Sequence, residues 1–144
     1  MWRFIKEYPF SILVILAVAY LSLSRPPSMI IPLFRHWDKI AHFCMYGGLS
    51  GVIWIEFLFQ HRKKKAKTIH AILGPVLCPV LFGGLMELCQ QYFTNYRSGD
   101  WMDFLANMAG VIIATLIAWF ILRPLIKLKA VETKEIEETE DMGS

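Results

Sequence analysis

Residues 83–110 decide the fold, and they read GGLMELCQQYFTNYRSGDWMDFLANMAG. Two strongly apolar segments meet here across a short polar turn. Each carries a carboxylate and an amide close to that turn, Glu87 and Gln90 before it and Asp103 and Asn107 after it. An ionisable group at the middle of a membrane helix costs about 2.5–3.5 kcal/mol on insertion scales, so such groups are kept where they have a role. The stretch therefore predicts two membrane helices with a functional site near their connection.

The rest of the chain has the composition of an integral membrane protein. Of its 144 residues, 56% are hydrophobic, and the mean hydropathy is positive, which excludes an ordinary soluble domain. A helix needs about 20 apolar residues to cross a bilayer. Four segments come near this length with little charge, at 9–24, 40–60, 69–92 and 102–122. We predict an all-α protein with four transmembrane helices, the first of them short.

Basic residues are concentrated on one side of the predicted spans. That side holds Arg3, Lys6, Arg62, Lys63, Lys64, Lys65, Lys67, Arg123, Lys127, Lys129 and Lys134, and the other side only Arg25, Arg35, Lys39 and Arg97. The positive-inside rule therefore predicts that both termini and the loop 61–68 are cytoplasmic. This basic loop lacks interleaved aromatic residues, so we expect it to contact anionic lipid and not nucleic acid. Residues 1–130 then form the membrane domain, and the charged segment 131–144 a disordered cytoplasmic tail.

The second predicted span begins with a polar stripe. Asp38, His42 and Tyr46 are four residues apart, so their side chains share one face of a helix. His42 alone would fit a hydrogen-bonded core histidine, but on this stripe we interpret it as functional. The neighbouring Lys39 is predicted to point elsewhere and to extend toward the membrane interface.

Glycines and prolines suggest how the helices pack. Gly47 and Gly51 form a GxxxG pair, which permits close helix contact and makes a homo-oligomer through these residues a candidate. Pro75 and Pro79 are expected to bend the third span, because a proline inside a helix frees a carbonyl group.

The connection between the third and fourth spans adds Arg97 and Asp100. An aspartate at the start of a helix also stabilises it as a cap or a dipole partner, by about 1 kcal/mol. This alternative applies to Asp100 and to Asp103.

The predicted topology brings the polar groups of three helices to one depth, in the outer third of the bilayer. We expect a single pocket that is open to the outside. If Lys39 points away, carboxylates outnumber cations there, so either one acid retains its proton or a divalent cation completes the site. The candidate metal ligands are Asp38, Glu87 and Asp103.

Three motifs together resemble the VanZ-like family of small bacterial membrane proteins. They are DKxxHFxxY from Asp38 to Tyr46, ExxQ from Glu87 to Gln90, and RxxDxxDxxxNxxG from Arg97 to Gly110. The resemblance covers roughly residues 38–115. It implies a multi-pass protein of the bacterial cytoplasmic membrane, with relatives linked to low-level resistance to teicoplanin-type glycopeptides. It implies no settled biochemical activity.

Three functions remain open on the sequence. The first is a membrane enzyme that acts on a phosphate- or sugar-bearing envelope lipid or lipid-linked precursor. Its catalytic candidates are His42, Glu87, Asp103 and Asp38, with His42 or Glu87 as the base, and its substrate-binding candidates are Arg97, Gln90, Asn107, Tyr46 and Asp100. The second is a module that binds or transports a lipid, an antibiotic or an ion without chemistry. The third is a structural assembly protein whose polar stripes join the helices.

Overall fold

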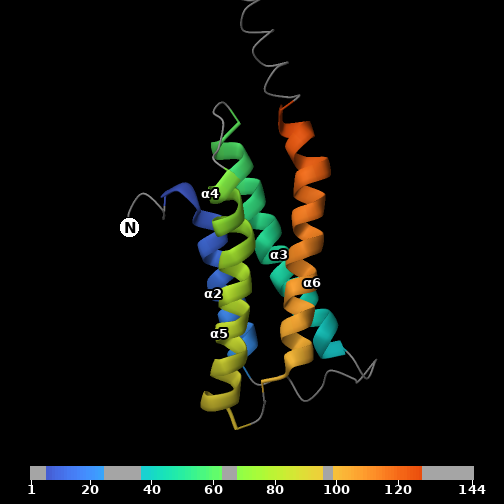
Figure 1. Cartoon of the computed structure of the whole chain (residues 1–144). Coiled ribbons are helices and arrows are strands. Elements are labelled where there is room, and N and C mark those ends of the chain that lie inside the picture. Colours follow the sequence, from blue (N-terminus) through green and yellow to red (C-terminus); the bar gives the residue numbers. More distant parts are fainter. Residues whose placement is uncertain (1–5, 25–36, 63–67, 96–98, 128–144) are drawn as a thin grey trace, which may run out of the picture.

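The computed structural model describes residues 6–24, 37–62, 68–95 and 99–127, and these ranges contain helices and no strand. The helices lie side by side along one direction (Figure 1). They are α2 (Pro9–Leu23), α3 (Trp37–Gln60), α4 (Thr68–Ile72), α5 (Cys78–Phe93) and α6 (Trp101–Ile117), with π-helical turns η1 (Leu73–Leu77) and η2 (Ala118–Leu122). The prediction of an all-helical protein is confirmed.

Three helices of the described chain are long and apolar enough to cross a membrane: Trp37–Gln60, Ile69–Phe93 and Trp101–Lys127. The second runs from α4 through η1 into α5, and the third continues from α6 through η2. Apolar α2 has 15 residues and is shorter than these three. The segment 131–144 and most of the basic loop lie outside the described residues.

Helices α3 and α6 approach closely at two glycines. A Cβ atom on Gly110 would lie 2.3 Å from the carbonyl oxygen of Phe43, and one on Gly47 would lie 3.2 Å from the carbonyl oxygen of Gly110. Small residues allow such backbone contact between membrane helices. Gly47 therefore packs against α6 of the same chain, whereas a Cβ atom on Gly51 would meet nothing within 4 Å.

Pro75 lies in the π-helical turn η1, and Pro79 lies in the first turn of α5. Pro79 has no N–H group, so the carbonyl of Pro75, four residues earlier, cannot receive its usual helical hydrogen bond. The buried Ser50 hydroxyl of α3 donates to this carbonyl at 2.7 Å. A side chain of a neighbouring helix thus satisfies the freed backbone group, as membrane helices require.

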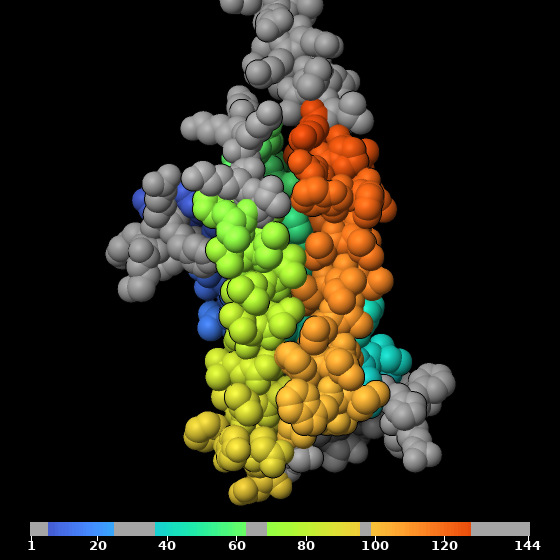
Figure 2. Space-filling view, in the orientation of Figure 1, coloured from blue at the N-terminus to red at the C-terminus, as the bar shows by residue number. Residues whose placement is uncertain are grey.

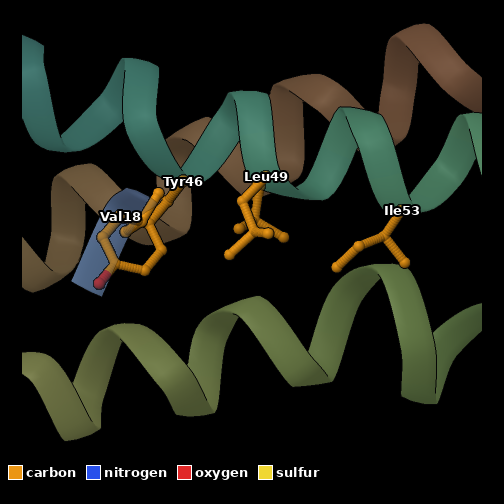
Figure 3. Packing of buried hydrophobic residues seen from close by; sticks show 5 residues of the cluster. Val18, Tyr46, Leu49 and Ile53 are labelled. Atoms are coloured by element: carbon orange, nitrogen blue, oxygen red, sulfur yellow. The ribbon is translucent and has the colours of Figure 1, made fainter. Parts of the chain in front are cut away.

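Apolar side chains fill the middle of the bundle. Val18, Tyr46, Leu49, Ile53 and Val111 form one buried cluster. Figure 3 shows Tyr46, Leu49 and Ile53 pointing from α3 toward α5. A second cluster, which follows further along α3, is formed by Trp54, Phe57, Ala71 and Ala118.

Side chains of other helices hold both ends of α2. Pro9 occupies the first turn, and the next two N–H groups, of Phe10 and Ser11, donate to the two carboxylate oxygens of Glu56 at 2.9 and 3.0 Å. The Ser11 hydroxyl donates to Glu56 as well. At the other end, Gln90 Nε2 donates to the carbonyl of Ser22 at 2.8 Å. Glu56 is therefore an interhelical cap, a role that was not predicted from the sequence.

Candidate functional site

The predicted site residues that the structure describes gather at one end of the bundle, where α5 ends and α6 begins. Asp38 lies in the first turn of α3 and Asp103 in the first turn of α6, where the helix dipole favours negative charge. The site residues His42, Tyr46, Glu87, Gln90, Asp103 and Asn107 are all buried. The structure thus brings together polar groups from three separate helices.

His42 is the centre of this cluster and is fully buried. Its Nδ1 atom lies 3.1 Å from Asn107 Oδ1 and 3.5 Å from Glu87 Oε1, and its Nε2 atom lies 3.9 Å from Asp103 Oδ2. An amide oxygen only accepts hydrogen bonds, so Nδ1 is the donor toward Asn107. The ring also stacks parallel to Tyr46, at 6.4 Å between centroids. This geometry fixes the orientation of the imidazole and points Nε2 toward the acids at the start of α3 and α6.

Three residues around the ring form a group that could hold a cation. Asp38, His42 and Asp103 each offer a ligand atom, and these atoms lie within 4.8 Å of one another. The hydrogen bond from Nδ1 to Asn107 is the kind of outer contact that orients a metal-binding histidine. Of the three ligands predicted from the sequence, Asp38 and Asp103 belong to this group. Glu87 lies on the Nδ1 side, and His42 takes its place.

The prediction that Lys39 points away from the site is wrong. Its ammonium group lies 2.8 Å from Asp100 Oδ2 and 2.8 Å from Asp103 Oδ1. The long lysine stem turns toward α6 because two carboxylates lie there. Lys39 offsets part of the negative charge, and its hydrogen bond is the main reason why the pKa of Asp100 is below its ordinary value.

The chain before α6 is tied back to α5 by hydrogen bonds. The Asp100 N–H donates to Glu87 Oε2 at 3.1 Å, and the Gly99 N–H donates to Gln91 Oε1 at 3.0 Å. A Cβ atom on Gly99 would lie 2.6 Å from the carbonyl oxygen of Glu87, so only glycine fits. Asp100 also caps α6 by accepting from the Met102 N–H. The capping alternative is thus confirmed for Asp100, whereas the carboxylate of Asp103 contacts Lys39.

Comparison with known proteins identifies the family. Residues 2–123 match the VanZ/LLP1 family. The chain belongs to the VanZ/LLP1 family. A relative from the yeast Schizosaccharomyces pombe, an uncharacterized protein, is 29% identical over 113 residues, which cover 78% of this chain and 64% of the relative. The chain thus spans less than two thirds of the length of that relative. No solved structure matches the present chain. Because the relative comes from a yeast, membership of the family does not imply a bacterial protein.

The remaining predicted site residues of this VanZ/LLP1 protein have different surroundings. Gln90 donates to α2, and its Oε1 atom has no hydrogen-bond partner within the described chain; the same is true of Asn107 Nδ2. Tyr46 contributes to both the polar site and the apolar core. Arg97, the predicted phosphate ligand, lies outside the described residues.

Helix α2 contributes to this end of the bundle, which was not predicted from the sequence. Ser22 is fully buried, and its carbonyl binds Gln90. The sequence contains a pattern that indicates this contact. Ser11 and Ser22 are eleven residues apart, or three helical turns, so two serines share one face of an apolar helix. Both are buried, which shows that this face packs against the other helices.

Proposed function

We propose that this VanZ/LLP1 protein binds the polar head of a membrane lipid at the His42 end of the bundle and carries out acid–base chemistry on it. The observation that carries the proposal is the placement of a fully buried histidine between an amide and a glutamate on one side and an aspartate on the other. Buried ionisable groups are costly in a membrane protein, so they tend to be kept where they have a role.

The contacts suggest a division of labour. Asn107 holds the His42 ring through Nδ1, so Nε2 is the atom that exchanges a proton with a bound head group. Glu87 and Asp103 are close enough to stabilise the imidazolium that forms, and Lys39 holds the carboxylate of Asp103 in place. A positioned acid or base of this kind contributes about 10²–10⁴-fold in rate.

The membrane arrangement is part of the proposal. All four helices cross the bilayer, residues 1–130 form the membrane domain, and the segment 131–144 is a cytoplasmic tail. The uneven distribution of basic residues in the sequence supports cytoplasmic termini and therefore an extracytoplasmic site. In a bacterium, the lipid would be a phosphate- or sugar-bearing envelope lipid or precursor, and its modification would contribute to teicoplanin resistance. Arg97 would supply the contact to a phosphate.

A second candidate is a divalent cation at Asp38, His42 and Asp103. The convergence of three ligand atoms and the oriented imidazole favour it. Elemental analysis of purified protein tests it. About one metal ion per chain, lost in His42→Asn and retained in Gly48→Ala, is the expected result, and unchanged acid–base activity without metal would contradict it.

The test of the main proposal is turnover of lipid. Purified protein is incubated in nanodiscs with envelope lipid, and the lipids are examined by mass spectrometry. A mass change that requires His42 and Glu87 supports an enzyme, with Gly48→Ala on the exposed face of α3 as the control. A lipid that co-purifies unchanged, and is lost in Glu87→Gln, supports the binding module. If Glu87→Gln and Asp103→Asn lose function only as far as they lose stability, the structural alternative is correct.

A further inference from the structure

A groove of about 600 Å³ opens between α5 and α6 at the same end as the polar site. Leu81, Leu85 and Leu88 line it from one face of α5, and each is more than half exposed. Phe104 of α6 forms the facing wall; a Cβ atom on Gly84 would lie 3.4 Å from its ring. Figure 2 shows α5 and α6 side by side along the bundle. The groove has the size of a typical ligand pocket and is lined mostly by apolar atoms.

One residue joins the groove to the polar site. Glu87 lines the groove, and its Oε1 atom lies 3.5 Å from His42 Nδ1. Because α5 belongs to a helix that is apolar enough to span a membrane, its exposed leucines face lipid. A chain that enters between α5 and α6 therefore reaches the site without leaving the bilayer. A lipid has an apolar hydrocarbon chain and a polar head group. The apolar groove is suited to the chain, and the polar cluster that it joins is suited to the head group.

At the polar end of the groove, as far as the structure describes it, the carboxylates of Glu87 and Asp100 are acceptors, and the nearby backbone N–H groups are already bonded. The Gly99 N–H is bonded to Gln91 and the Asp100 N–H to Glu87. The ammonium group of Lys39 uses two of its hydrogens on Asp100 and Asp103. A phosphate binds through donors, whereas carboxylates bind groups that donate. The described lining therefore favours a head group with hydrogen-bond donors over a bare phosphate.

From these contacts we propose that the groove between α5 and α6 holds a hydrocarbon chain of the lipid substrate, and that its head group presents hydroxyl or ammonium donors to Glu87 and Asp100. This inference rests on the proposed function and narrows its substrate class. Sugar hydroxyls and an amine supply the same donor chemistry, and the experiment separates them.

The head group is tested by native mass spectrometry of the purified full chain with three lipids that have identical acyl chains. These are monoglucosyl diacylglycerol, phosphatidylethanolamine and phosphatidic acid. We expect one of the first two to bind at least about tenfold tighter than phosphatidic acid, because a donated hydrogen bond to a charged carboxylate is worth about that factor. Whichever of these two lipids binds more tightly shows whether the donor is a sugar hydroxyl or an amine. Equal or tighter binding of phosphatidic acid would overturn the donor assignment.

The groove is tested with Gly84→Leu, whose side chain would fill it beside Phe104. We expect about tenfold weaker binding of the preferred lipid, and no change in the control Gly48→Leu, because a Cβ atom on exposed Gly48 would meet nothing within 4 Å. If Gly84→Leu lowers the unfolding temperature more than the control does, Leu85→Trp serves as the second groove-filling variant.

The outcomes separate this inference from the proposed function. Unchanged binding in both groove variants, together with loss of binding in Glu87→Gln, would overturn the groove and leave the polar site intact. Full binding and full turnover in Glu87→Gln would overturn the proposed function itself.

Discussion

Two glutamates in membrane helices have different surroundings at opposite ends of the bundle. The oxygens of Glu56 accept from the Phe10 and Ser11 N–H groups and from the Ser11 hydroxyl, which are neutral donors of one helix start. Glu87 accepts from the Asp100 N–H and lies 3.5 Å from the His42 ring, within a cluster of ionisable groups. A carboxylate in a membrane helix is therefore not sufficient evidence for a functional site.

The difference lies in the partners of each carboxylate. Glu56 replaces the cap that α2 lacks, because Tyr8 at the cap position forms no side-chain capping bond. Removing Glu56 leaves backbone donors unsatisfied, so its role is stability. Glu87 instead lies between the groove and a buried imidazole, where a change in its charge alters the site. Substitutions at the two glutamates and at the contacts between the helices test whether Glu56 serves stability and Glu87 serves the site.

The largest expected effect on stability is that of Glu56→Ala. The substitution removes the acceptor of three hydrogen bonds, each with a net contribution of about 1 kcal/mol, so we expect a loss of about 3 kcal/mol in the free energy of unfolding. Glu56→Gln keeps one acceptor oxygen and should lose less. Glu87→Gln should lose about 1 kcal/mol or less while abolishing lipid binding or turnover. Unfolding in detergent measures all three, and a greater loss in Glu87→Gln than in Glu56→Ala would reverse the two roles.

Gly110→Ala should have the next largest effect. The new Cβ atom would lie 2.3 Å from the carbonyl oxygen of Phe43, so α3 and α6 must separate. Overpacking of this kind costs about 1–3 kcal/mol. Because Phe43 is adjacent to His42, the site should lose activity beyond its share of the lost stability. Gly48→Ala is the control, and equal unfolding temperatures for both variants would contradict the close contact.

Ser50→Ala should cost about 1 kcal/mol, because the Pro75 carbonyl loses its donor. In a Pro79→Ala background, a backbone N–H becomes available to that carbonyl, so the same substitution should cost less. A double-mutant cycle of unfolding free energies measures the coupling. Since Ser50 lies between the two ends of the bundle, we expect no selective loss of lipid binding. Equal costs in both backgrounds would show that the hydroxyl acts elsewhere.

The smallest expected effect is that of Asp100→Asn. Asparagine caps a helix as well as aspartate does, so the variant isolates the charge. Lys39 lowers the pKa of Asp100, so the ionised group adds stability above its ordinary pKa of 3.8, and this contribution is lost as the pH falls through the lowered value. Wild type should be slightly more stable than the variant at neutral pH, and the difference should vanish in acid. Unfolding measured across pH tests this, and a difference that grows in acid would contradict the assignment.

Much of the fold could be predicted because hydrophobic length and helical spacing are local properties. The predicted spans 9–24, 40–60, 69–92 and 102–122 differ from the observed helices by a few residues at most of their ends. The four-residue spacing of Asp38, His42 and Tyr46 put them on one face of α3, and the family resemblance was confirmed. The role of each site residue stays a prediction.

The partners of the long side chains could not be predicted in this way. Lys39 was expected to point elsewhere because its neighbours on α6 are more than sixty residues away in the chain. The assignment of His42 in place of Glu87 to the candidate cation group also depends on how α3, α5 and α6 are rotated against one another. That rotation is fixed by contacts such as Gly47 with Gly110, which involve atoms distant in sequence.

The sequence by itself determined which segments form apolar helices and which face of the second, third and fourth is polar, because both follow from residues within a few turns of one another. Only the tertiary structure decided that Glu56 caps α2, that Lys39 binds the acids of the site, and that a groove leads from Glu87 to exposed leucines of α5. These features depend on the distances between helices, and those distances are set by packing that involves the whole bundle at once.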